Sequence, residues 1–466
     1  MPRTTYYLTI FVVGFSFIAA TAVMAQVQPS ASGGATQDDE RMMIPPMLIG
    51  TPYANEAGVD LRQNVLTTQV GATVAYDDNV LPDEFSTPVG DTMISIAPVV
   101  SYLRSTPKQQ DIFDYSPTYT IYTPEAVLAS GNTTTSSPGN TSALNSLNQS
   151  ADGIFQGQLS KRFTLGLQDG FIRTSNVFDV SYPFSAIGLG GSTQAPTPAA
   201  IAPYAEQLRN QATVFLSYQF SPYGMFGGSG SFANIRFPNP SQSTGFYNSD
   251  GSVGSIFYDR RFARRQYFGA TYGYNWVQAY RTGISAESET NEVLGFYSVF
   301  FNRNFSLSAA AGTKYALTRV IPVQTPATSW NPEIVLSMGW QGNRGNVSAS
   351  FLRTVASGGG LIGTFNSVSA NLGAGWKLQR FWNASVSFSY QNIEPVSYLV
   401  GLPYQGGNSL MAQGSIQRAL GTHFTMQCGY QRLHEQYIGI AAVSADPDGD
   451  RAYVTINYLL RKPLGR

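Results

Sequence analysis

Residues 382–391 read Trp-Asn-Ala-Ser-Val-Ser-Phe-Ser-Tyr-Gln, an unbroken alternation of apolar and polar side chains. Successive side chains of a β-strand point to opposite faces, so this stretch predicts a strand with one apolar face and one face of hydroxyls and amides. Trp382 and Tyr390 stand at the two ends of the apolar face. Because these side chains are enriched where a membrane meets water, the pattern is typical of a strand that crosses a bilayer.

The same alternation recurs between Leu66 and Leu460, most clearly in residues 268–276 and 368–376. No apolar run long enough for a membrane helix interrupts it. Only a closed barrel hides every strand edge within a bilayer. The predicted fold is therefore all-β, a transmembrane antiparallel up-and-down β-barrel of about 18 strands with short periplasmic turns and long extracellular loops.

The composition distinguishes this barrel from a soluble β-sandwich or propeller, whose strands also alternate. Charged residues make up 12% of the chain and aromatic residues 13%. Soluble domains average roughly 25% charged residues. A lipid-facing wall needs no charges, so the composition favours the membrane barrel.

The N-terminus predicts export from the cytoplasm. Arg3 precedes a mostly apolar stretch, and Val23-Met24-Ala25 is a small-residue cleavage site. We expect a signal peptide at 1–25, with a retained membrane anchor as the alternative. Residues 26–62 lack periodicity and predict a disordered periplasmic segment, and 63–466 predict the barrel. The expected location is the bacterial outer membrane, with its lipids as partners.

The connections between the predicted strands alternate in length and charge. Short, mostly basic ones include 161–162, 260–265 and 377–380. Long ones, several of them acidic, lie at 77–90, 124–150, 176–204, 237–247, 282–289, 318–328, 357–363, 393–407 and 434–450. Short turns of such barrels face the periplasm and long loops the exterior, so both chain ends are expected in the periplasm.

The polar faces predict the lining of a water-filled lumen, because a barrel of roughly 16–18 strands is too wide for side chains to fill. The predicted lining is close to neutral and rich in hydroxyls and amides, which suits hydrated sugars. The alternative is a wet lumen that selects nothing. The candidate lumen-lining residues are Tyr267, Thr271, Asn275, Lys314, Arg353, Asn371, Lys377, Asn383, Ser385, Ser387 and Gln391.

The sequence offers no set of residues for catalysis, metal binding or a cofactor. Cys428 is the only cysteine, and His423 and His434 are the only histidines. A catalytic triad or a metal centre needs such ligands in a fixed cluster. The arginines of 260–265 are more typical of a basic turn than of a nucleic-acid patch. We therefore expect no enzyme and no nucleic-acid partner.

The first two predicted hairpins resemble a known family. Tyr76-Asp77-Asp78-Asn79-Val80 is followed by Ile96-Ala97-Pro98 and Tyr115-Ser116-Pro117-Thr118-Tyr119. This resembles outer-membrane β-barrel proteins found with bacterial exopolysaccharide export systems, whose first strand typically ends in a similar Tyr-Asp-x-Asn-Val. The resemblance implies a barrel that helps pass secreted polysaccharide, with export machinery and a glycan as partners. One departure is that several residues follow Tyr458, although outer-membrane barrels usually finish on an aromatic residue.

Two classes of function stay open at this point. The first is a transport channel, for polysaccharide or oligosaccharide or for small solutes in general. The second is a structural or adhesive barrel whose loops plug the lumen.

Overall fold

The computed structural model describes residues 63–79, 90–106, 108–123, 145–175, 206–239, 245–281, 283–302, 304–321, 326–357, 360–396, 405–439 and 448–465. The expected signal peptide and periplasmic segment lie outside these residues. No helix within them is long and apolar enough to cross a membrane.

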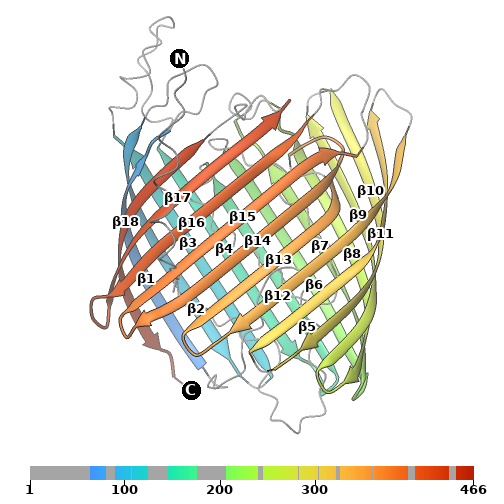
Figure 1. Ribbon diagram of the computed structural model, residues 1–466, viewed down its shortest axis with the longest axis horizontal. Coiled ribbons are helices and arrows are strands. Elements are labelled where there is room, and N and C mark those ends of the chain that lie inside the picture. The colour runs from blue at the N-terminus through green and yellow to red at the C-terminus, as the bar shows by residue number, and fades with distance from the viewer. Residues whose placement is uncertain are drawn as a thin grey trace, which may run out of the picture.

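The described chain forms one 18-stranded antiparallel sheet in which each strand pairs with its neighbours in sequence. The strands are tilted against the barrel axis (Figure 1). They are β1 Gln63–Asp77, β2 Asp91–Ser105, β3 Gln109–Tyr122, β4 Ser146–Gln158, β5 Phe163–Thr174, β6 Gln207–Ser221, β7 Gly224–Arg236, β8 Asn248–Ala263, β9 Gln266–Arg281, β10 Ile284–Phe300, β11 Phe305–Ile321, β12 Ala327–Gln341, β13 Gly345–Ser357, β14 Thr364–Gln379, β15 Trp382–Pro395, β16 Gly406–Ala419, β17 Phe424–Ile438 and β18 Gly449–Pro463.

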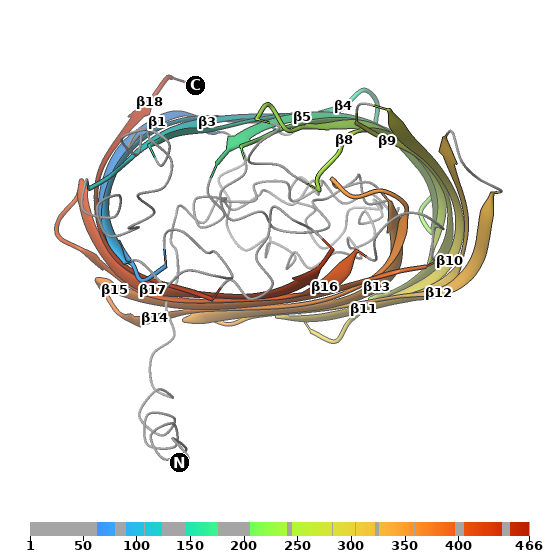
Figure 2. The ribbon, with the colours of Figure 1, turned by 90° about the horizontal axis from the view of Figure 1, so that it is seen from above.

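The sheet closes because β1 also pairs with β18, from Val65 opposite Pro463 to Asp77 opposite Arg451. No strand is left with an open edge, which confirms the predicted barrel and its strand number. Seen from above, the ring is flattened, with β8 and β16 on opposite long sides (Figure 2).

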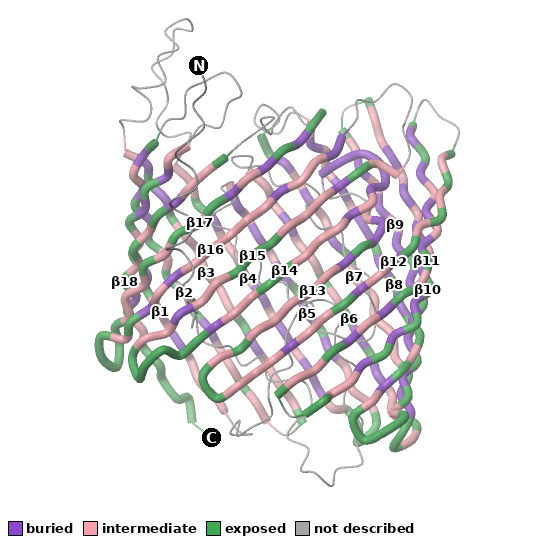
Figure 3. Tube along the Cα trace, in the orientation of Figure 1, coloured by how far each residue is buried: buried purple, intermediate pink, exposed green. Residues whose placement is uncertain are grey.

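The two faces of the wall follow the alternation read from the sequence. Large apolar side chains such as Leu372, Trp376 and Phe388 are exposed on the outer face. Residues between them face the lumen. Burial therefore alternates along the strands, whereas the short turns at one rim are exposed (Figure 3).

Aromatic side chains gather on the outer face near both rims. Near the short turns Trp340 stacks on Trp376 with ring centroids 6.2 Å apart. The Arg418 guanidinium lies 5.1 Å from the centroid of the Trp382 ring. Near the opposite rim the ring centroids of Tyr315 and Trp330 lie 5.1 Å apart. Such girdles on either side of an apolar band mark the two membrane–water boundaries, so the chain is an integral β-barrel of the bacterial outer membrane.

The lengths of the connections differ most from expectation after β9, although the loops predicted at 318–328 and 434–450 are also shorter than expected. A long loop was predicted over 282–289, but β9 ends at Arg281 and β10 already begins at Ile284. Glu287 and Glu289 therefore lie in β10, opposite Gln278 and Trp276 of β9. The prediction was wrong because strand ends extend beyond the apolar zone, where the outer face carries acidic residues without penalty.

Candidate functional site: the inner wall of the barrel

Two sectors of the inner wall, separated on one side by β2 to β5, differ in their chemistry. The inner faces of β13 to β18 and of β1 form the polar sector, which hydroxyl and amide side chains dominate. The inner faces of β6 to β12 form the mixed sector, which combines apolar side chains with buried charges.

Hydrogen bonds between neighbouring strands link the side chains of the polar sector. The Ser389 hydroxyl donates to Asn371 Oδ1 at 2.7 Å. The Gln427 amide donates to Ser415 Oγ at 2.9 Å and to Tyr453 Oη at 3.1 Å. Further bonds between neighbouring strands join Asn371 to Ser350, Gln69 to Asn457 and Thr73 to Thr455, and Gln413 of β16 reaches across β17 to Tyr453 of β18.

Five uncharged residues of the sequence-predicted lining lie in this sector. Asn371 belongs to β14, and the other four, which belong to β15, are Asn383, Ser385, Ser387 and Gln391. Asn371 and Ser387 are exposed although they face inward. The inner wall is therefore accessible to water at the level of Asn371 and Ser387.

The three predicted lining residues of β9 also face inward but are buried. Tyr267 packs with Phe215, Met225 and Phe257 in an apolar cluster. The Thr271 hydroxyl donates to the Ile256 carbonyl at 3.1 Å. Sequence reasoning missed this apolar cluster, because its members come from four strands whose inner faces are mostly small or polar.

The three predicted basic residues have three different environments. Lys314 faces inward, and its Nζ lies 2.9 Å from Glu292 Oε2. Lys377 lies opposite Asn383 and is exposed at the rim of the short turns.

Arg353 was predicted to line the lumen, but the register places it on the outer face. It lies opposite Ile334 of β12 and Val368 of β14, and it is exposed. Arg353 follows Phe351 in the outward phase of β13, four residues before that strand ends. A long basic side chain near a strand end reaches the headgroup layer, so an outward arginine is tolerated there.

The family-like motif lies at the junction of the first and last strands. Asp77 is buried and binds Arg451 of β18, with Arg451 Nη2 2.8 Å from Asp77 Oδ2. The Asp450 amide donates to Asp78 Oδ1 at 2.7 Å, and the Asn79 side chain donates to the Asp448 carbonyl at 2.8 Å. Tyr76 is exposed on the outer face. The motif therefore closes the barrel, a role that its spacing alone did not reveal.

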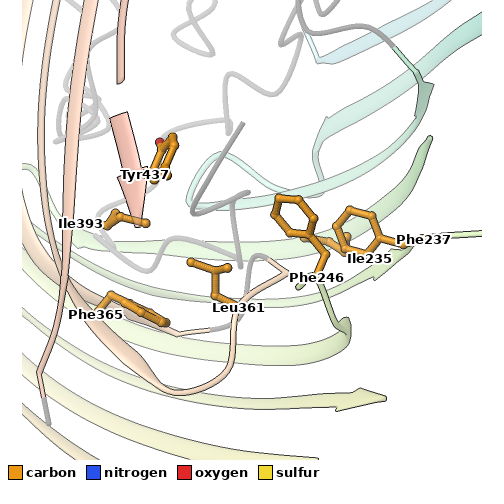
Figure 4. Close-up of a cluster of buried hydrophobic side chains, with 7 residues drawn as sticks. All are labelled: Ile235, Phe237, Phe246, Leu361, Phe365, Ile393 and Tyr437. Carbon is orange, nitrogen blue, oxygen red and sulfur yellow. The ribbon is translucent and has the colours of Figure 1, made fainter. Parts of the chain in front are cut away.

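An apolar bridge crosses the lumen near the rim of the long loops. Leu361, from the connection between β13 and β14, is fully buried between two groups of side chains (Figure 4). We define the apolar bridge as the cluster of Ile235, Phe237, Phe246, Leu361, Phe365, Ile393 and Tyr437. Its members come from β7 and its loop on one long side and from β14, β15 and β17 on the other.

Backbone geometry holds this inward fold in place. The Tyr247 amide donates to the Gly360 carbonyl at 2.8 Å, which joins the β7–β8 and β13–β14 connections. Gly360 has a φ of 92°, in the left-handed region that favours glycine. A Cβ at this position would lie 2.9 Å from Phe246 and 3.0 Å from Phe237.

Buried carboxylates are the main feature of the inner wall that the sequence did not predict. Instead of the expected near-neutral lining, the mixed sector holds Asp259, Glu292 and Glu333, and the polar sector holds Glu435. The only signal in the sequence was their position two residues from an inward-facing apolar residue, as Glu292 is from Leu294, because residues two apart on a strand share a face.

Comparisons with known proteins give structural similarities only. No protein-family model matches the chain, and no curated protein sequence matches it significantly. The chain is similar to OccAB4 of Acinetobacter baumannii, at 12% identity over 87% of this chain and 100% of that one, with a TM-score of 0.39. It is similar to OpdK of Pseudomonas aeruginosa, solved with vanillate, at 9% identity over 85% and 99%, with a TM-score of 0.40. It is also similar to the siderophore receptor PirA of Pseudomonas aeruginosa, at 10% identity over 84% and 80%, with a TM-score of 0.36.

Proposed function

We propose that this barrel is an outer-membrane channel for hydrated saccharides, and that it assists the passage of polysaccharide or oligosaccharide. The observation that carries the proposal is the polar sector. Its hydroxyls and amides line the inner wall from β13 around to β1, and Asn371 and Ser387 within it are exposed to water.

The chemistry of this sector fits a neutral polyhydroxylated solute. Each hydroxyl or amide both donates and accepts hydrogen bonds, as each sugar hydroxyl does. A moving saccharide therefore exchanges one partner for the next at little net cost, because a hydrogen bond between protein and solute replaces one with water.

The direct test is conductance of the purified barrel in planar bilayers with cello-oligosaccharides added as blockers. We expect open channels whose current is reduced by the sugar. Replacing Ser387 and Ser389 by valine removes two hydroxyls from the sector, and we expect block to weaken roughly 2- to 10-fold for each hydroxyl lost.

The matched control is Ser252→Val, because Ser252 of β8 lies on the outer face. The oligosaccharide should reduce the current through this variant as much as through the unmodified protein. Equal block in all variants would exclude the polar sector as the saccharide path, and channels that no sugar blocks would favour the general small-solute porin.

The export role rests on the resemblance of the Tyr76–Asn79 motif, and it has its own test. Deletion of the gene should lower the amount of secreted polysaccharide while growth on oligosaccharides stays the same. The reverse result would support uptake, and an unchanged amount of secreted polysaccharide would remove the export role.

The apolar bridge favours a second candidate, a barrel closed by its own loops. Its side chains join the two long sides of the flattened ring through Leu361. A closed barrel of this kind predicts no current in the unmodified protein and current only after the bridge is broken.

A further inference from the structure

Four exposed basic residues lie together at the short-turn rim of β12 to β16. We call them the basic cluster, and they are Arg344, Lys377, Arg380 and Arg418. The Lys377 amide donates to the Arg344 carbonyl at 2.6 Å, which joins β14 to the β12–β13 turn. Arg418 of β16 lies opposite Trp382 of β15, which follows Arg380 by two residues. The cluster therefore spans neighbouring strand ends at one edge of the wall.

Within the described strands, no carboxylate balances the charge of the basic cluster. The acidic residues of β12 to β17 lie at mid-strand or nearer the long-loop rim, and they are Glu333, Glu394 and Glu435. At that opposite rim the outward arginines do form ion pairs. Arg236 Nη2 lies 2.7 Å from Asp250 Oδ1, and Arg319 Nη1 lies 3.0 Å from Glu289 Oε1. The basic cluster is therefore a patch of uncompensated positive charge.

Stacking on aromatic rings holds two of these charges at the membrane surface. The Arg380 guanidinium lies 5.2 Å from the centroid of the Phe381 ring, and that of Arg418 lies over Trp382. Trp382 belongs to the aromatic girdle that marks the membrane–water boundary at this rim. A guanidinium over an aromatic face keeps its charge and its hydrogen-bond donors. These charges therefore lie at the level of the lipid headgroups.

We propose that the basic cluster binds the phosphate of an anionic phospholipid of the phosphatidylglycerol type. Arginine donates two parallel hydrogen bonds to a phosphate, and lysine adds a point charge. The acyl chains of the same lipid pack against the apolar outer face of the wall, where Leu372 and Phe388 are exposed. An anionic phospholipid thus matches both features, whereas a soluble acidic protein matches only the charge. In the predicted orientation this lipid lies in the periplasmic leaflet.

The test measures which lipid surrounds this rim by quenching of tryptophan fluorescence with brominated lipids. Trp276→Phe and Trp330→Phe in the full-length protein remove the two tryptophans nearer the long-loop rim. The reporters that remain are Trp340, Trp376 and Trp382. The protein is reconstituted in equimolar bilayers of phosphatidylglycerol and phosphatidylcholine, in which either the first or the second lipid is brominated.

Brominated phosphatidylglycerol should quench the reporters more strongly than brominated phosphatidylcholine. We expect a relative binding constant of roughly 5, the factor that one basic residue near an anionic surface supplies. Sodium chloride at about 1 M should remove most of this preference, because the Debye length falls from about 10 Å at 0.1 M to about 3 Å.

Two variants assign the preference to the charge of the basic cluster. Replacing all four of its residues by glutamine should abolish the preference. The matched control replaces its three arginines by lysine, which keeps every charge, and it should retain the preference. Strand content by circular dichroism and compact migration of the unheated protein in gels show that each variant has folded.

A further control tests whether the preference is local. Arg264→Gln with Arg265→Gln removes two charges from the turn between β8 and β9, away from the reporters, and it should leave their quenching unchanged.

Three results would overturn the proposal. The first is equal quenching by the two lipids. The second is a preference that survives in the glutamine variant or disappears in the lysine variant, because the charge of the cluster would then not be its cause. The third is a response of the reporters to a soluble polyglutamate peptide but to neither lipid, which would assign the rim to an acidic protein instead.

Discussion

At the scale of single residues, two ion pairs that each involve β18 differ mainly in burial. Asp77 and Arg451 are 2–3% exposed, and Tyr122 Oη lies 3.4 Å from both. Arg432 and Asp450 are separated by 3.1 Å but are 47% and 29% exposed. Removing one partner of a buried pair leaves an uncompensated charge, whereas an exposed pair contributes little.

We therefore predict that Arg451→Met lowers the free energy of unfolding by about 3–5 kcal/mol. Arg432→Met should lower it by about 0–1 kcal/mol. Urea unfolding in detergent, followed by tryptophan fluorescence, measures both. The double variant Asp77→Asn with Arg451→Met should recover part of the loss, and failure to recover any would show that burial of the Asp77 charge is not the cause.

At the scale of elements, strands were easier to predict than loops. The alternation of 382–391 determined both faces of β15. A strand with one apolar row and one hydroxyl-bearing row has only one stable placement between lipid and water. Arg353 was misplaced because a phase error of one residue moves every side chain of a strand to the other face. The inward fold of Leu361 was not predictable, since its partners lie in β7, the β7–β8 connection, β14, β15 and β17, and no local pattern records them.

The apolar bridge gives a prediction at this scale. Leu361→Asp places a charge between apolar side chains, so the connection between β13 and β14 should leave the lumen. We expect a higher single-channel conductance or a larger fraction of open channels in planar bilayers. The control Leu420→Asp changes an exposed residue in the turn between β16 and β17, and it should leave the conductance unchanged.

At the scale of the whole molecule, the two rims differ in their connections. The short turns and the ends of β1 and β18 share one rim, and the long connections share the other. The sequence predicted this division from turn length and charge. The buried carboxylates escaped prediction, because their position inside the ring depends on the register of every strand between them.

The orientation of the barrel follows from this division and has a direct test. In a Cys428→Ser background, Arg281→Cys places a thiol at the long-loop rim, and Arg264→Cys places one at the opposite end of β9. A maleimide that does not cross membranes should label only the first in intact cells, and both after the outer membrane is permeabilised. Labelling of Arg264→Cys alone in intact cells would mean that the barrel is inserted the other way up.

Because β1 pairs with β18, the first strand cannot complete its hydrogen bonding until the last strand has been exported. Until β18 is delivered, Asp77 lacks Arg451 and two strand edges lie open. An open edge is a template for pairing with strands of other chains. We therefore expect the unfolded polypeptide to need chaperones in the periplasm. The arrival of β18 therefore decides when the sheet closes into a ring.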